Sequence, residues 1–291
     1  MNASRMILLA LVATLALPAA AQAAKPEQQY YVSLGDSYAS GYQPTAPGTG
    51  ANTRNGFAYQ VPKLATARGY RYELVNFGCG GETTVSLLQR KERCSGAVPD
   101  GRQYAGRTQI AAAERFLRAH RGKVGLITVS IGGNDVTKCT RDADPVPCVV
   151  AAVTAINENV TTIARRLRAA AGKNVRIVGT TYPDVILGQW VGENANQELA
   201  KLSVGAFRDF INPALTKAYA AAGGKLVDVT AASGAYGSLD ELVTFPSGTL
   251  VPKPVADVCR LTYYCQFRDI HARTSGYKLI ADLVVASLPR R

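Results

Sequence analysis

The sequence has few histidines and no close pair of cysteines, the two features on which protein zinc sites most depend. It contains two histidines in 291 residues, and none of its six cysteines belongs to a C-x-x-C pair. Because zinc ligands come mainly from Cys and His at such spacings, we expect no metal site. The glycine-rich stretch 78–81 also lacks the last glycine of a dinucleotide fingerprint, since Thr83 stands there, so no such cofactor is expected.

Long runs of one charge are missing as well. The formal net charge of +12 comes from 33 Lys and Arg against 21 Asp and Glu, and the basic residues gather only in short groups at 90–93 and 165–168. There is no basic tail and no alternation of basic with aromatic residues, so we expect no nucleic-acid partner. We interpret the charge as a solvated surface. Peripheral contact with an anionic cell envelope is the alternative.

The first residues have the pattern of a secretory signal peptide. Arg5 precedes an apolar stretch at 6–17, and Ala21-Gln22-Ala23 forms a small-residue cleavage site. The stretch is shorter than the ~20 residues of a spanning helix, and we expect no later segment to span a membrane. We predict that residues 1–23 are removed and that residues 24–291 (291 − 23 = 268) form one secreted domain, which we expect to be a monomer.

The six cysteines that follow this segment predict disulfides, because their count is even and the predicted compartment is oxidising. Six cysteines allow fifteen pairings, and sequence cannot choose among them rigorously. We favour the nearest-neighbour set because each pair then lies within one connection of the chain. That set is Cys79–Cys94, Cys139–Cys148 and Cys259–Cys265.

Short apolar runs alternate with Ala-rich helical patterns along the chain. The runs lie at 30–34, 72–76, 124–131, 175–180 and 225–229, and the helical patterns at 57–68, 108–120, 149–171, 195–222 and 274–288. Continuous apolar runs suit strands buried on both faces, and their alternation with helices predicts a parallel sheet covered on both sides. The predicted fold class is α/β, a three-layer α/β/α sandwich with about five parallel strands. Loops are expected at 41–56, 95–106 and 232–257.

Glycine-broken polar stretches follow the first three predicted strands. They are GDSYASG (35–41), NFGCGGETT (76–84) and SIGGNDVTKC (130–139), and a fourth stretch, FRDIHARTSGY (267–277), precedes the last helix. The carboxyl ends of parallel strands meet at one sheet edge, where ligands bind. Ser37 is a nucleophile only beside a base. His120 ends a helical pattern among arginines and is expected to be solvated, so we pair Ser37 with His271.

In this order and spacing, the four stretches resemble the four blocks of the SGNH (GDSL) hydrolases, over nearly the whole predicted mature chain. With the signal peptide and six cysteines, the resemblance is greatest to secreted actinobacterial esterases and lipases. No G-x-S-x-G nucleophile elbow is present. The resemblance implies an esterase or lipase that acts on a small-molecule or lipid ester without metal or cofactor. A phospholipase or thioesterase, or a non-catalytic envelope-binding protein of the same fold, is the alternative.

The resemblance also assigns roles to individual residues. Ser37 matches the nucleophile and His271 the base. The oxyanion hole, a set of donors that stabilises the developing negative charge, matches the N–H groups of Ser37 and Gly81 and the side-chain amide of Asn134. Glycine at position 81 permits close backbone approach.

One departure from the family pattern concerns the group that orients His271. The family commonly has D-x-x-H, whereas Arg268 stands three residues before His271 and the aspartate is Asp269. If this segment is extended, the side chains of Asp269 and His271 point to the same face. The alternative is a backbone carbonyl near Arg268, which we favour slightly. Asp36 and Asp135 are predicted to be structural.

Two further stretches leave their roles open. Residues 185–190 contain Val185, Ile186, Leu187 and Trp190, which either line an acyl pocket or pack on the domain surface. The cysteines lie close in sequence to Gly81, Asn134 and His271, so disulfides there would brace three loops of the site.

Overall fold

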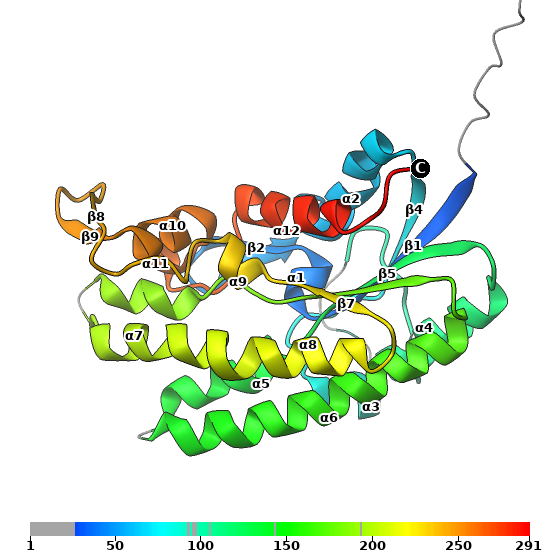
Figure 1. Cartoon of the computed structure of the whole chain (residues 1–291), viewed down its shortest axis with the longest axis horizontal. Helices are drawn as coiled ribbons and strands as arrows, with labels where there is room; N and C mark the ends of the chain where they lie inside the picture. The colour runs from blue at the N-terminus through cyan, green and yellow to red at the C-terminus, as the bar shows by residue number, and fades with distance from the viewer. Residues whose placement is uncertain (1–26, 92–93, 95–97, 105, 143, 193) are drawn as a thin grey trace, which may run out of the picture.

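Five parallel strands form the centre of the protein, in the order β4-β1-β5-β6-β7 (Figure 1). They are β1 (Gln28–Gly35), β4 (Arg71–Asn76), β5 (Val124–Ser130), β6 (Arg176–Thr180) and β7 (Lys225–Val227). The computed structural model describes residues 27–91, 94, 98–104, 106–142, 144–192 and 194–291. The predicted signal peptide lies outside the described residues.

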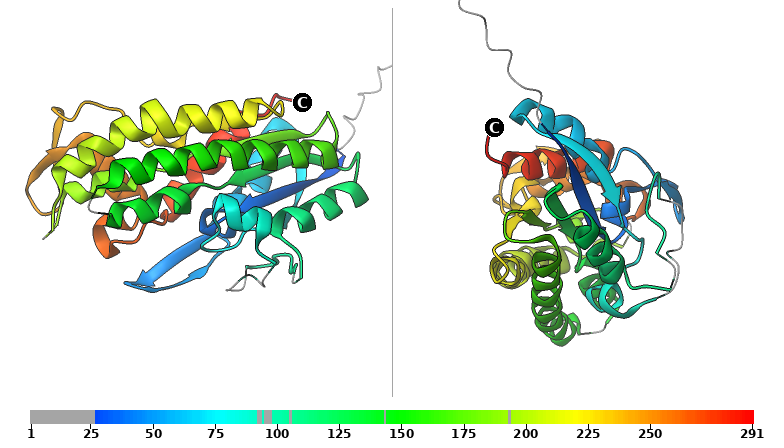
Figure 2. Two further views of the ribbon diagram at one scale, coloured as in Figure 1. Left: turned by 90° about the horizontal axis from the view of Figure 1, so that it is seen from below. Right: turned by 90° about the vertical axis from the view of Figure 1, so that its right-hand side faces the viewer.

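Helices cover both faces of the sheet (Figure 2). Alternate side chains of β1 show why: Val32 and Leu34 belong to the larger buried cluster, and Tyr31 belongs to a second cluster on the other face. The larger cluster takes in α4 (Gln109–Ala119), α6 (Pro145–Ala171) and α8 (Asn212–Ala220), and the second takes in α2 (Phe57–Ala65) and α12 (Thr274–Ala286). Because strands buried on both faces need apolar residues throughout, this arrangement accounts for the continuous apolar runs. The predicted three-layer α/β/α fold is confirmed.

The predicted long helices are present with small shifts at their ends. The pattern at 57–68 becomes α2 and a 3₁₀ turn η1 (Thr66–Arg68), and the pattern at 195–222 becomes α7 (Gln197–Gly205), a π-helical turn η4 (Ala206–Ile211) and α8. Short elements follow the strands. They are α1 (Ser37–Ser40), α3 (Thr84–Gln89), α5 (Gly133–Thr137), η2 (Lys138–Arg141), η3 (Val185–Trp190) and α9 (Val229–Ala232).

Two of the predicted loops contain regular structure. Residues 41–56 include a hairpin of β2 (Tyr42–Ala46) and β3 (Thr49–Asn52). Residues 232–257 include β8 (Leu242–Thr244), β9 (Leu250–Pro252) and the start of α10 (Lys253–Leu261), which is followed by α11 (Tyr264–Phe267). Gly and Pro are frequent in both segments, which is why turns were expected there, but short antiparallel pairs with tight turns use the same residues.

α6 departs from the expectation that no later segment could span a membrane. By length and composition alone this helix of 27 residues is long and apolar enough to do so. Its buried residues recur at three- and four-residue spacing, among them Ile156, Val160 and Ile163, and they belong to the cluster that packs on the sheet. α6 is therefore an amphipathic covering helix of the fold.

The cysteines pair as neighbours in the sequence: Cys79 with Cys94, Cys139 with Cys148, and Cys259 with Cys265. The first pair, 15 residues apart, closes the connection after β4. The second joins η2 to α6, and the third joins α10 to α11. In the chain-entropy model a loop of that first length stabilises the fold by about 3 kcal/mol.

Candidate active site

Ser37 stands at the point where β1 ends against β5. Gly35 has a φ of +130°, and a Cβ there would lie 1.9 Å from the Ser130 carbonyl oxygen, so only glycine fits. The side chain of Asp36 then caps α1 by accepting from the Tyr38 N–H at 2.9 Å. This turn leaves Ser37 as the first residue of α1, with 7% of its surface exposed.

His271 reaches Ser37 from the segment between α11 and α12. The Ser37 Oγ and the His271 Nε2 are 2.7 Å apart, although the residues are 234 positions apart in sequence. The Tyr263 N–H donates to the His271 carbonyl at 2.9 Å, and the Tyr42 ring lies against the imidazole with centroids 4.4 Å apart. The hydroxyl and the imidazole are therefore placed for proton transfer.

Asp269, not a backbone carbonyl, contacts the other nitrogen of His271. Asp269 Oδ1 lies 2.6 Å from His271 Nδ1 and also accepts the His271 backbone N–H at 2.9 Å. The slight preference for a carbonyl near Arg268 is wrong. Arg268 has a left-handed φ of 54°, which turns the chain so that its guanidinium donates to the carbonyls of Gly188 and Val191.

Asp269 keeps its charge despite partial burial. Burial alone raises the pKa of this carboxyl, but the hydrogen bonds and the electrostatic interaction with His271 outweigh burial and lower its pKa. A carboxylate at Nδ1 fixes the tautomer in which Nε2 is free to accept a proton from Ser37.

Asn134 and Asp135 clamp the loop that contains Gly81. Asn134 Nδ2 donates to the Glu82 carbonyl at 2.8 Å. Asp135 accepts from the N–H and the hydroxyl of Thr84 at 2.9 and 2.7 Å, which gives it the structural role expected. An amide NH₂ has two donors, so Asn134 retains one for the pocket that it lines with Ser37.

Gly81 takes a backbone conformation that favours glycine. Its φ is +73°, and a Cβ at this position would meet no atom within 4 Å, which leaves open space beside it. The same loop is held against β1 by the Cys79 N–H, which donates to the Gly35 carbonyl at 2.9 Å. Gly81 thus lies on a loop tied to both β1 and Asn134, although Gly81 itself is not among the residues that line the pocket beside Ser37.

Tyr182 is a site residue that the sequence analysis missed. It follows β6, and its hydroxyl donates to Asp36 Oδ2 at 2.6 Å. Its ring packs edge-on to Tyr38 and lies against Gly133, where a Cβ would be 3.1 Å from the ring. Burial raises the pKa of Asp36 to about 7, although this hydrogen bond lowers it. The position of Tyr182 after the fourth strand was the available signal, since ligands bind beyond strand ends.

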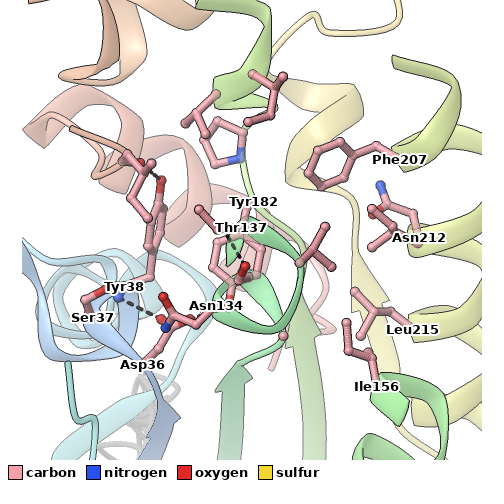
Figure 3. A pocket seen from close by; sticks show the side chains of 18 residues that line it. Asp36, Ser37, Tyr38, Asn134, Thr137, Ile156, Tyr182, Phe207, Asn212 and Leu215 are labelled. Carbon is pink, nitrogen blue, oxygen red and sulfur yellow. Dashed lines mark hydrogen bonds between the residues drawn. The ribbon is translucent and has the colours of Figure 1, made fainter. Parts of the chain in front are cut away.

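A pocket opens beside Ser37 and Asn134 (Figure 3). Most of its wall is apolar. The apolar lining residues include Val136, Ile156, Pro183, Val185, Ile186, Phe207, Ile211 and Leu215. Of the four apolar residues noted at 185–190, Val185 and Ile186 line this pocket, whereas Leu187 and Trp190 pack in a separate cluster with α10. The stretch is therefore divided between the wall of this pocket and the cluster with α10.

The turn that carries Val185 and Ile186 depends on a buried carboxyl. Asp184 is fully buried, caps η3 through the Ile186 N–H at 3.1 Å, and accepts the Ser203 hydroxyl at 2.8 Å. Burial raises the pKa of Asp184 from 3.8 to about 7, and these hydrogen bonds offset only part of that effect.

We predict that Asp184 weakens the fold as pH rises. Its pKa is higher in the folded chain than the ordinary 3.8, so its contribution to stability is full below that value and is lost as pH rises through about 7. Asn cannot ionise, so the Tm of Asp184→Asn minus the Tm of the unsubstituted protein should be larger at about pH 8 than at about pH 5. Thermal unfolding followed by circular dichroism at both pH values measures this. An unchanged Tm difference would contradict the prediction.

The remaining candidates lie away from this site. His120 caps α4 and stacks on Phe116, beside Tyr30 near the amino end of β1, whereas Ser37 follows its carboxyl end. It is half-buried rather than solvated, because the ring packs on these two aromatics. Within the described residues, one cluster has metal-ligand geometry, Cys139, Asp142 and Cys148, but its two sulfurs form a disulfide and offer no thiolate.

The site has a hydroxyl hydrogen-bonded to an imidazole, which is in turn hydrogen-bonded to a carboxylate. This series lies beside an amide donor at the carboxyl edge of a parallel sheet, which defines an ester-hydrolase type of site. The comparison with protein families agrees. The chain belongs to the GDSL-like lipase/acylhydrolase family, whose model matches residues 33–279, and it is a carboxylic ester hydrolase.

Solved structures of the same fold include two Streptomyces enzymes. An extracellular lipase from Streptomyces rimosus has a TM-score of 0.53 and 16% identity, covering 89% of this chain and 100% of the lipase. Phospholipase A1 from Streptomyces albidoflavus NA297 has a TM-score of 0.52 and 17% identity, and the match covers 89% of this chain and 99% of the phospholipase. No curated protein matches the sequence.

Proposed function

We propose that the protein cleaves carboxylic esters through an acyl-enzyme formed on Ser37. The observation that carries this proposal is the distance of 2.7 Å between Ser37 Oγ and His271 Nε2. His271 accepts the hydroxyl proton as Ser37 Oγ attacks the ester carbonyl carbon, and Asp269 stabilises the resulting imidazolium.

The charge on the carbonyl oxygen is stabilised by the N–H groups of Ser37 and Gly81 and by the second amide proton of Asn134. The alcohol then leaves with the proton from His271, and the acyl group stays on Ser37. Water, deprotonated by His271, attacks the acyl-enzyme, releases the acid and restores the hydroxyl. Each step uses backbone and side-chain groups of this chain together with water, and none calls for a metal or an organic cofactor.

The substrate class that we propose is an ester with an apolar acyl group, because the pocket beside Ser37 is lined mainly by aliphatic residues and Phe207. A small-molecule or lipid ester fits this description. We also propose that residues 24–291 form a single secreted domain that acts as a monomer, in keeping with three disulfides, which persist in oxidising compartments. Its net positive charge would permit peripheral contact with an anionic envelope.

A serine-directed fluorophosphonate probe tests the proposal. We expect one phosphonylated peptide, containing Ser37, when the labelled protein is digested and analysed by mass spectrometry. Ser37→Ala should abolish labelling, and Ser40→Ala, three residues along the same helix, should leave it intact. An unlabelled Ser37 in correctly folded protein would rule out an activated serine and favour a binding protein that has lost catalysis.

A further inference from the structure

The far wall of the pocket contains one polar residue among apolar neighbours. Asn212, the first residue of α8, is 4% exposed and lies beside Phe207 and Leu215, across the pocket from Ser37 and Asn134 (Figure 3). The π-helical turn η4 immediately precedes it and supplies two of the apolar lining residues, Phe207 and Ile211. Single π-helical turns are frequent at functional sites.

The orientation of the Asn212 amide is fixed by its partners. Nδ2 lies 3.0 Å from Asp228 Oδ1, 3.1 Å from Thr230 Oγ1 and 2.8 Å from the Tyr236 hydroxyl. A flipped amide would place Oδ1 against the Asp228 carboxylate, and two acceptors cannot bond to each other. Nδ2 therefore faces Asp228, and Oδ1 is held on the opposite side of the amide.

Oδ1 has no hydrogen-bond partner among the described residues, although it is buried. A buried acceptor without a donor is unfavourable, and most such groups in native proteins are paired. An all-carbon acyl chain in this pocket would leave Oδ1 unpaired. A chain that carries a hydroxyl at this depth would supply the donor.

We propose that Asn212 is a specificity-determining residue, which selects esters whose apolar acyl chain carries a hydroxyl group at the far wall of the pocket. The inference rests on the proposed function, because it takes the pocket beside Ser37 as the acyl site. The aliphatic lining holds the acyl chain of the substrate. The amide oxygen of Asn212 favours those acyl chains whose hydroxyl lies within hydrogen-bonding distance of it. Sites built to bond a substrate hydroxyl reject analogues that lack it, because the site's own polar group is then left unpaired.

The test compares p-nitrophenyl esters of ω-hydroxyalkanoic acids with those of the unsubstituted acids, from about six to about twelve carbons. At the chain length that reaches Asn212, we expect the hydroxylated ester to have a higher kcat/KM by about 5- to 100-fold. Asn212→Leu, which keeps the size but removes the oxygen together with the Nδ2 contacts, should abolish this preference and improve hydrolysis of the unsubstituted ester. Asn212→Ala, which makes no new contact, serves the same purpose should the leucine variant fail to fold.

Asn157→Leu is the matched control, since Asn157 also has a buried Oδ1 that finds no hydrogen-bond partner in the described part of the chain, but Asn157 does not line the pocket. It should keep the full hydroxyl preference. A ratio near one at every chain length in the unsubstituted protein, or an unchanged preference in both Asn212 variants, would overturn the inference. If hydrolysis of the unsubstituted esters does not depend on Ser37, the proposed function itself fails, and the two failures are thereby distinguished.

Discussion

Ser37→Ala is expected to lower kcat for p-nitrophenyl ester hydrolysis by about 10⁴- to 10⁶-fold, down to the rate that binding and oxyanion donors support alone. The loss is large because the acyl-enzyme route needs the oxygen that lies 2.7 Å from His271 Nε2, and alanine has no atom there. The fold should survive. The α1 cap uses Asp36 and the Tyr38 N–H, neither of which involves the Ser37 hydroxyl.

The measurement is the initial rate over a range of substrate concentrations, with KM reported separately. KM should change little, since the pocket that holds the acyl group is intact. His120→Ala is the control, because it removes the other histidine of the chain from a position at the opposite end of β1. Full activity in Ser37→Ala, or an equal loss in both variants, would show that the reaction does not proceed through Ser37.

The architecture could be predicted because its signals are local and repeated. The inner strands β1, β5 and β6 are largely apolar and buried, and each long covering helix has apolar residues at helical spacing. A run such as 124–131, in which every residue of β5 is buried, has few other ways to fold. The strand-end rule then placed Ser37 and Asn134 at one edge, and the structure places both on the same pocket.

What could not be predicted depends on backbone conformation or on contacts between distant segments. Which group contacts Nδ1 of His271 depends on the left-handed φ of Arg268, and the sequence does not reveal that conformation. Tyr182 and Asn212 were missed because their side chains are positioned by hydrogen bonds with Asp36 and Asp228, 146 and 16 residues away. The hairpin β2–β3 was hidden because its short strands contain Pro44 and Gly50, which indicate a loop.

Asp269→Ala is expected to lower kcat by about 10³- to 10⁴-fold, less than the loss of Ser37 but far more than a surface substitution. Without the carboxylate, nothing at Nδ1 selects the tautomer with a free Nε2, and the imidazolium formed during attack has no counter-charge. The imidazole should stay in place, since its backbone is held by the Tyr263 N–H and its ring by Tyr42.

Asp269→Asn separates orientation from charge. One oxygen, Oδ1, accepts both the His271 backbone N–H and Nδ1, so an asparagine can keep its own oxygen there and lose only the negative charge. Its rate should therefore fall between those of Asp269→Ala and the unsubstituted enzyme. Asp282→Asn, an exposed aspartate paired with Lys278 on α12, controls for the change in net charge and should be near normal. Rates within about threefold of normal for both Asp269 variants would mean that the carboxylate neither orients His271 nor stabilises its imidazolium form. The tautomer of His271 would then be set by the backbone alone.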